Sequence, residues 1–117
     1  MGNSVLRKKV ENDLKAGDKI DVSSQRLAYQ HLLTFKLSTM KHVTVINASY
    51  NDIEKLPPKL EKLVRLKRLT LTKNKLTSLP PELEALTSLN RLELGNNQLP
   101  AIPPSLFEKL VQLEEFR

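Results

Sequence analysis

From Leu56 onward, apolar residues recur along this chain at a fixed interval, which is the distance in sequence from Leu56 to Leu79. This repeat constrains the fold more than any other feature of the sequence. The interval recurs in several sets: Leu56, Leu79 and Ile102; Leu60, Leu83 and Leu106; Leu66 and Leu89; Leu69 and Leu92; Leu71 and Leu94; Leu76 and Leu99. Three asparagines and three proline pairs keep the same phase: Asn51, Asn74 and Asn97; Pro57-Pro58, Pro80-Pro81 and Pro103-Pro104. Chance clustering of leucine would not align asparagine and proline as well, so the chain is an array of internal repeats.

Each repeat predicts one short strand, because leucines two positions apart lie on the same face of an extended chain. A single repeat cannot bury its leucines, so neighbouring repeats must stack and their strands form a parallel sheet. The outward positions of the three copies are Val45, Asn47, Ser49 and Tyr50; Arg68, Thr70, Thr72 and Lys73; Arg91, Glu93, Gly95 and Asn96.

The aligned asparagines and prolines have structural explanations. An asparagine side chain both donates and accepts hydrogen bonds. We therefore expect Asn51, Asn74 and Asn97 to form a structural ladder that bonds the backbone of their own turn and of the next. The proline pairs are expected to keep the chain extended after each turn.

The two ends of the chain depart from the repeat. Near the C-terminus the interval is one residue longer than the repeat, as seen from Leu86, Leu89 and Leu92 to Leu110, Leu113 and Phe116. This difference predicts a one-residue insertion near residues 106–107. The sequence ends where a fourth strand should begin, so we expect a missing C-terminal cap and a fragment of a longer protein. The alternative is a short protein that self-associates through this end.

Residues 1–42 predict an N-terminal cap, and residues 43–117 predict about three full repeats and the start of a fourth. Leu6, Val10 and Leu14, with Val5 beside Leu6, form one apolar stripe on a helix over residues 3–16. Asn3 or Ser4 is expected to cap this helix, and Gly17 to end it. Ile20 and Val22 predict a first strand, followed by a degenerate repeat.

Composition argues against catalysis. The chain has no cysteine, and His31 and His42 are its only histidines. The sequence contains no nucleophile elbow, phosphate-binding loop or zinc-protease motif. We therefore expect no enzyme, no metal, no cofactor and no small-molecule substrate, and we interpret both histidines as edge residues. Apolar runs are too short to span a membrane.

The net charge of +6 is unevenly distributed. Residues 1–75 carry the basic excess, and residues 76–117 are acidic on balance. Basic patches attract anionic partners, but base-stacking platforms need aromatic side chains, which are few here. We expect no nucleic-acid binding. The second repeat adds Lys59, Lys62, Arg65, Lys67 and Lys75, which we interpret as a solvated surface rather than one anionic site.

The segments LVRLKRLTLTKNKLTSLPPEL and LTSLNRLELGNNQLPAIPPSL resemble the intracellular leucine-rich-repeat proteins of the 23-residue LPxxL type. The opening MGNS, Leu6-Arg7 and Val10-Glu11 resemble the start of a small member of that family. This resemblance implies an α/β leucine-rich-repeat solenoid with parallel strands on a concave face, an N-terminal helical cap and no catalysis. It also implies a protein partner on the concave face and an N-myristoylated Gly2.

We expect the partner to contact outward strand and turn residues, since Arg and Tyr are enriched in binding hot spots. The candidate residues are Tyr50, Arg68, Thr70, Thr72, Lys73, Arg91, Glu93 and Asn96.

The N-terminus also predicts a membrane anchor, with Gly2 as its acylation site. The myristoylation pattern M-G-x-x-x-[ST] departs at Leu6, with Ser4 two places early. One acyl chain binds membranes only marginally, so Arg7, Lys8 and Lys9 would supply a second signal. The expected location is the cytoplasm, with peripheral membrane attachment. The alternative is a soluble protein whose basic surface binds acidic partners or anionic lipid without lipidation.

Overall fold

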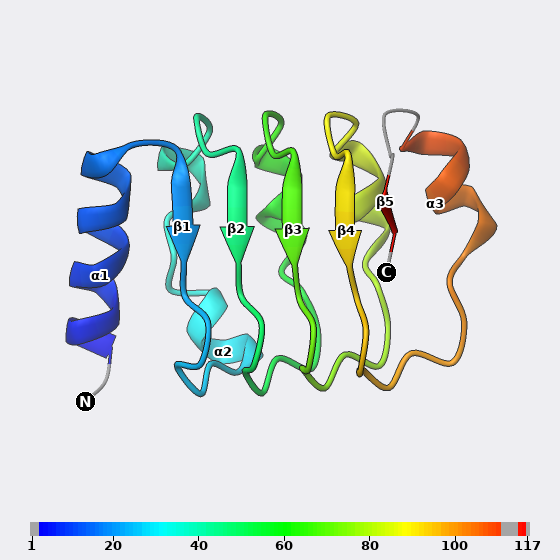
Figure 1. Ribbon diagram of the computed structural model, residues 1–117, viewed down its shortest axis with the longest axis horizontal. Coiled ribbons are helices and arrows are strands. Elements are labelled where there is room, and N and C mark those ends of the chain that lie inside the picture. Colours follow the sequence, from blue (N-terminus) through cyan, green and yellow to red (C-terminus); the bar gives the residue numbers. More distant parts are fainter. Residues whose placement is uncertain (1–2, 111–114, 117) are drawn as a thin grey trace.

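A computed structural model describes residues 3–110 and 115–116 of the chain as an open solenoid. Its parallel strands lie side by side in chain order (Figure 1): β1 (Lys19–Asp21), β2 (Val45–Asn47), β3 (Arg68–Thr70), β4 (Arg91–Glu93) and β5 (Glu115–Phe116). Helix α1 (Asn3–Ala16) stands beside β1 at one end of the sheet. This arrangement confirms the predicted α/β leucine-rich-repeat solenoid.

Short helical segments lie behind the sheet (Figure 1): α2 (Tyr29–Leu32), η1 (Leu37–Thr39), η2 (Pro58–Lys62) and η3 (Pro81–Ala85). Helix α3 (Pro104–Lys109) lies to the side of β5. The first proline of each pair is extended, as Pro57 shows with φ −73° and ψ 144°. The second proline instead begins the helical segment. The prediction that both prolines keep the chain extended is therefore wrong for the second one. Proline suits the first helical position because the N–H that it lacks would have no partner there.

Strand register follows the sequence spacing. Ile46 pairs with Leu69, and Leu69 pairs with Leu92, each exactly one repeat further along the chain. Leu92 pairs with Phe116, one residue beyond the repeat interval, as the predicted insertion requires. The slot of Leu113 lies outside the described residues. At the other end Ile20 pairs with Ile46.

The core is one continuous apolar cluster that runs from Leu6 to Leu110. Leu6 and Val10 of α1 are buried in it, and Leu14 packs against it. Val5 is 74% exposed, so its place in the predicted stripe is wrong. One residue along a helix turns the side chain by about 100°, which carries Val5 off the buried face. In residues 3–110 and 115–116 no helix has the length and apolar character that crossing a membrane requires.

Three asparagine side chains connect successive repeats. Asn74 Oδ1 accepts the Ile53 N–H at 3.1 Å, and its Nδ2 donates to the Ala48 and Leu71 carbonyls, both at 3.0 Å. Asn97 repeats the pattern with Leu76 N–H, Leu71 O and Leu94 O.

Asn51 makes the equivalent bonds toward the cap. Its Oδ1 accepts the N–H groups of Gln25 and Leu27, and its Nδ2 donates to the Val22 and Ala48 carbonyls. In each case the amide bonds its own turn and the preceding repeat. The predicted bonds to the next repeat are wrong, because the amide lies against the chain that leaves the strand before it.

Replacing Asn74 by alanine should lower the free energy of unfolding by about 3 kcal/mol. The change removes the acceptor of a buried N–H and one donor from each of two buried carbonyls. Urea unfolding followed by circular dichroism measures the difference. Asn12→Ala, at an exposed position of α1, is the matched control and should leave stability unchanged or slightly raised. Equal unfolding midpoints for Asn74→Ala and the wild type would contradict the ladder's role.

Candidate binding surface

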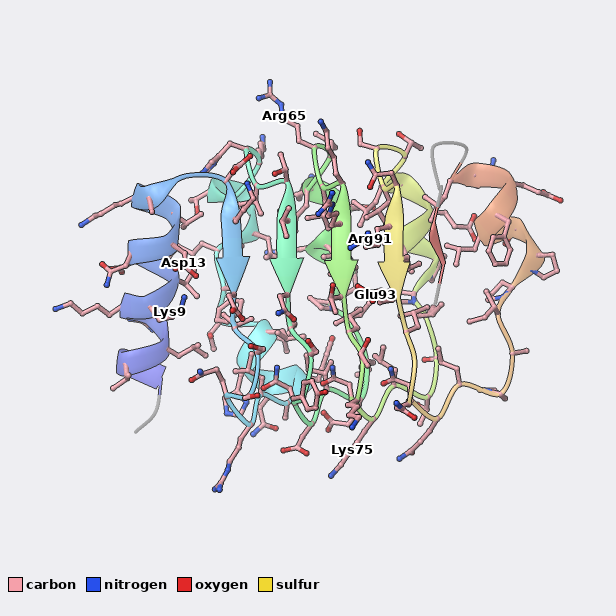
Figure 2. All side chains as sticks on the ribbon, in the orientation of Figure 1. Lys9, Asp13, Arg65, Lys75, Arg91 and Glu93 are labelled. Carbon is pink, nitrogen blue, oxygen red and sulfur yellow. The ribbon has the colours of Figure 1, made fainter. Side chains whose placement is uncertain are left out.

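Two rows of outward side chains cross the sheet, because parallel register aligns equivalent residues of neighbouring strands. We call this surface the strand face. The first row contains Lys19, Val45, Arg68 and Arg91, and Glu115 of β5 is in register with Arg91. The second row contains Asp21, Asn47, Thr70 and Glu93. Figure 2 shows Arg91 and Glu93 on β4.

The two rows differ in chemistry. The first row is dominated by cations, of which Arg68 is exposed and Arg91 is half-buried. The second row contains hydrogen-bonding groups, and one bond crosses between strands: Thr70 Oγ1 donates to Glu93 Oε2 at 3.2 Å. The strand face therefore offers donors along the strand starts and mostly acceptors along the strand ends.

A third row lies in the turns that follow the strands. Tyr50, Lys73 and Asn96 occupy equivalent positions and have left-handed backbone angles, with φ of 59°, 59° and 57°. Asparagine tolerates this conformation, but tyrosine and lysine rarely adopt it. The Lys73 ammonium lies 5.1 Å from the centre of the Tyr50 ring, and Tyr50 is 56% exposed. The turn row therefore presents an aromatic ring and a cation together.

The structure brings the candidate partner-binding residues together on one surface, with different degrees of exposure. Tyr50, Arg68, Lys73 and Asn96 are exposed, whereas Thr70, Thr72, Arg91 and Glu93 are half-buried.

One outward position was predicted wrongly, because Ser49 is buried. Its hydroxyl bonds Asn47 Oδ1, and its carbonyl accepts the Ser24 N–H at 3.0 Å. The hydroxyl therefore lies beside Asn47 on the outward side, and the residue is covered rather than exposed.

The sequence interpretation overlooked the first strand's contribution. Lys19 and Asp21 extend the two rows by one strand. The signal was present, because the alternation of Ile20 and Val22 places Lys19 and Asp21 on the opposite side of that strand.

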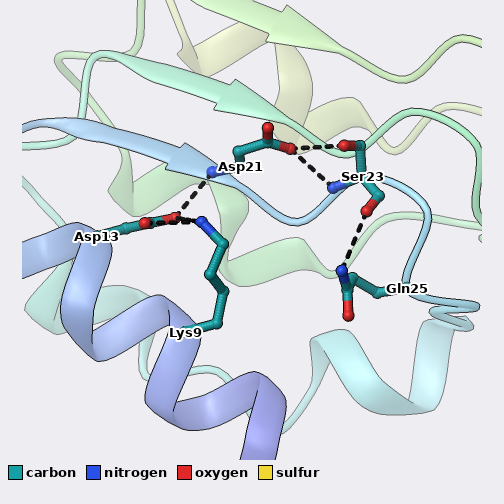
Figure 3. A network of polar contacts seen from close by, with 5 residues as sticks. All are labelled: Lys9, Asp13, Asp21, Ser23 and Gln25. Carbon is teal, nitrogen blue, oxygen red and sulfur yellow. Dashed lines mark hydrogen bonds and ion pairs between the residues drawn. The ribbon is translucent and has the colours of Figure 1, made fainter.

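A polar network holds α1 against the edge of the strand face (Figure 3). Lys9 Nζ contacts both carboxylate oxygens of Asp13, at 2.8 and 2.7 Å. Asp13 Oδ2 accepts the Asp21 N–H at 3.0 Å. An edge strand leaves such N–H groups without a strand partner, so α1 supplies the missing acceptor. This contact fixes the cap helix to the sheet.

Two aspartates at this edge favour their charged forms. Hydrogen bonds from the Ser23 hydroxyl (2.6 Å) and N–H (3.0 Å) lower the pKa of Asp21, and the charge of Lys9 adds to the effect. The hydrogen bond from the Thr44 hydroxyl, at 2.8 Å, is the main cause that lowers the pKa of Asp18, with help from Lys19.

His31 makes a structural hydrogen bond, and His42 lies at the surface. His31 Nδ1 accepts the Ala28 N–H at 2.9 Å at the start of α2, and His42 is exposed in the loop before β2. In the part of the chain that the structure describes, no three His, Asp or Glu side chains gather to hold a metal ion.

Comparison with known proteins agrees with this geometry. Residues 64–117 match the leucine rich repeat family model. A leucine-rich-repeat protein of Leptospira interrogans is 32% identical, with a TM-score of 0.58 over 68% of this chain and 20% of that chain. No curated protein matches the sequence.

Two further solved structures are similar. An internalin of Listeria monocytogenes is 26% identical, with a TM-score of 0.60 over 68% of this chain and 23% of that chain. A chain of the SNF/U2A′ complex of Drosophila melanogaster is 27% identical, with a TM-score of 0.60 over 84% of this chain and 55% of that chain.

The match over residues 64–117, the parallel register and these neighbours define the fold as a leucine-rich-repeat solenoid. The present chain spans between about a fifth and about half of the length of the solved chains that it resembles.

The depressed pKa of Asp21 predicts a specific acid sensitivity. A carboxylate whose folded pKa lies below the ordinary value of 3.8 stabilises the fold above that value. This contribution is lost as pH falls through the folded pKa. The free energy of unfolding should therefore decline below about pH 4, and Asp21→Asn should decline less steeply because it cannot titrate. Urea titrations across this pH range measure both slopes. Identical slopes would show that Asp21 does not contribute to the pH dependence of stability. Part of the decline remains in both proteins, because the pKa of Asp18 is lowered as well.

Proposed function

We propose that this protein is a non-enzymatic scaffold that binds a protein partner across its strand face. Leucine-rich-repeat domains generally mediate protein–protein interaction and are typically not enzymes. The observation that carries the proposal is the register that places Arg68 and Arg91 in one row on adjacent strands. Beside them, Thr70 and Glu93 form the second row.

The chemistry of the strand face favours a partner with acidic and polar side chains. Arginine presents five donors in a planar fork and forms paired hydrogen bonds with carboxylates. The exposed Arg68 fits a partner that places a carboxylate along the first row, and Arg91 adds positive charge on the neighbouring strand. The SNF/U2A′ neighbour, which was solved as a complex, supports partner binding by this fold. We propose a protein partner rather than nucleic acid, because aromatic side chains suitable for base stacking are few.

The turn row supports the same proposal. The left-handed turn recurs in successive repeats, so it places Tyr50, Lys73 and Asn96 at equivalent positions in one row. The exposed Tyr50 ring supplies apolar contact area and a hydroxyl, which are common in binding hot spots. We infer that Tyr50 anchors one end of the partner and that Arg68 and Arg91 hold the other.

Reversing the charges of the first row should abolish partner capture. Arg68→Glu combined with Arg91→Glu would place two carboxylates where the partner's acidic groups dock, which should weaken binding about 100-fold or more. Pull-down from cell extract, with quantitative mass spectrometry, measures the captured proteins. Lys59→Glu with Lys75→Glu makes the same change in net charge at exposed positions off the strand face and is the matched control. If a well-folded Arg68→Glu/Arg91→Glu variant retains every partner that the control retains, the strand face is not the binding surface.

We also propose that the scaffold is cytoplasmic and attached to membranes through an acylated Gly2, a residue that lies outside the described part of the chain. The support is the glycine after Met1 and the likeness of MGNS, Leu6-Arg7 and Val10-Glu11 to the start of leucine-rich-repeat-containing protein 57.

The basic residues behind Gly2 would give the acyl chain limited help. Lys9 is paired with Asp13, and Arg7 lines a hollow that also contains Glu11. Lys8 is exposed, and no contact within residues 3–110 and 115–116 engages its ammonium. Membrane attachment would therefore rest mainly on the acyl chain and would be reversible.

Metabolic labelling tests the acylation directly. Cells that express the protein with a C-terminal tag are fed an alkyne analogue of myristate, and the purified protein is assayed for label. The wild type should be labelled and Gly2→Ala should not. Ser4→Ala, at a neighbouring position that bears no acyl chain, is the control and should be labelled. An unlabelled wild type would refute the anchor without affecting the proposed strand-face binding.

A further inference from the structure

A shallow hollow lies at the edge of the solenoid where the strands begin, away from the two rows of the strand face. It has a volume of about 340 Å³ and is lined by Lys41, Glu61, Lys62, Val64 and Ala85. We call it the entry hollow. Its residues come from the loops that enter β2 and β3 and from the ends of η2 and η3.

The repeat spacing explains why a hollow forms there. Lys41 and Val64 occupy the same slot of successive repeats, and so do Lys62 and Ala85. Stacked repeats place equivalent slots next to one another. Ala85 is much smaller than the lysine in the preceding repeat, so the surface recedes beside it. Val64 is 55% exposed, which gives the hollow an apolar wall.

The cations around the entry hollow are not used within the fold. Lys41, Lys62, Arg65 and Lys67 are exposed, and within residues 3–110 and 115–116 none forms an ion pair. Lysines elsewhere do form such pairs with aspartate, including Lys9, Lys19 and Lys75. Figure 2 shows Arg65 projecting from the strand-entry edge and Lys75 at the opposite edge. Glu61 is the one acidic side chain among the residues that line the hollow.

We propose that the entry hollow binds an acidic peptide segment of a partner protein, with one apolar side chain seated against Val64 and Ala85. Carboxylates on either side of that apolar residue would pair with Lys41, Lys62 and Arg65. Glu61 accepts hydrogen bonds and disfavours a uniformly anionic ligand, so it selects a segment with N–H donors between its carboxylates. This site is separate from the strand face and does not depend on the proposed function.

The shape favours a peptide over a lipid surface. A recess of this volume can receive a side chain, whereas a bilayer interface requires a broad face with several apolar side chains that insert. Within the lining of the hollow, Val64 and Ala85 are the apolar residues. These two side chains offer contact to a single apolar side chain of a peptide.

Fluorescence anisotropy with a synthetic probe tests the site. The probe is a fluorescein-labelled peptide of alternating glutamate and glycine with one central leucine, and it is titrated with the full chain at low salt. Lys62→Glu with Arg65→Glu should weaken binding about tenfold or more, because two attractive contacts become repulsive. Val64→Ser should weaken binding about threefold to tenfold through lost apolar contact. A probe with serine in place of leucine should lose affinity for the wild type by a similar factor.

Two controls separate this site from general charge attraction. Lys8→Glu with Lys75→Glu makes the same change in net charge at distant exposed positions and should bind the probe within about twofold of the wild type. Asn12→Ala, at an exposed position of α1 away from the entry hollow, should bind equally well.

Three outcomes would overturn the proposal. The wild type does not bind the probe, or both double variants lose the same affinity, or Val64→Ser and the serine probe bind unchanged. Sedimentation with phosphatidylserine vesicles is run in parallel. Vesicle binding that is lost in Lys62→Glu/Arg65→Glu, without any binding of the peptide, assigns the edge to membranes and also rejects the peptide site.

Discussion

No single repeat can bury its own leucines or pair its own buried polar groups, and the rest of the structure depends on this constraint. Each strand is three residues or fewer, and its leucines are covered only by the repeats on either side. The polar groups follow the same rule. Asn74 shares one hydrogen bond with its own turn and two with the preceding repeat, so backbone pairing in one repeat requires the next to be in place. Stability is therefore shared between neighbours, as in other solenoids.

This dependence leaves the outward surfaces free to vary. The buried positions and the asparagines must recur in every repeat, but the strand face and the entry edge carry different side chains in each one. Val45, Arg68 and Arg91 occupy one slot, and Tyr50, Lys73 and Asn96 another. The same register that aligns the core also aligns these variable residues in rows. A binding surface thus arises from the packing of the repeats without a dedicated loop.

Most of the fold follows from the sequence because its signals are periodic. The regular repeat interval predicts strand register, and the single one-residue slip predicts how β4 meets β5. The errors concern local geometry that a periodic pattern does not encode. Ser49 follows the alternation of the strand and bonds the outward Asn47, yet it is buried. The second proline begins a helical turn, and each asparagine bonds backward along the chain, a direction that spacing alone leaves undetermined.

The candidate surface was predictable in part. Outward strand positions follow from alternation, but the degree to which Thr70, Thr72 and Arg91 are covered depends on side chains of adjacent strands. The entry hollow was not predicted at all. It arises where a small residue in one repeat replaces a large one in the repeat before, and this difference becomes a recess only once the repeats are stacked. The basic residues nearby appeared scattered along the sequence for the same reason.

The parallel register also fixes the distance between equivalent side chains on the strand face. Neighbouring strands lie about 4.8 Å apart, so equivalent side chains in a row recur at that interval. Side chains on one face of an extended peptide recur at about 6.6 Å, and turns of an α-helix recur at about 5.4 Å. The side chains of an extended peptide bound along the row would therefore no longer face successive row residues after two strands. The side chains on one face of an α-helix would stay close to all four residues of the row, Lys19, Val45, Arg68 and Arg91. The spacing of the repeats thereby favours a helical partner over an extended one for contact with every residue of the row.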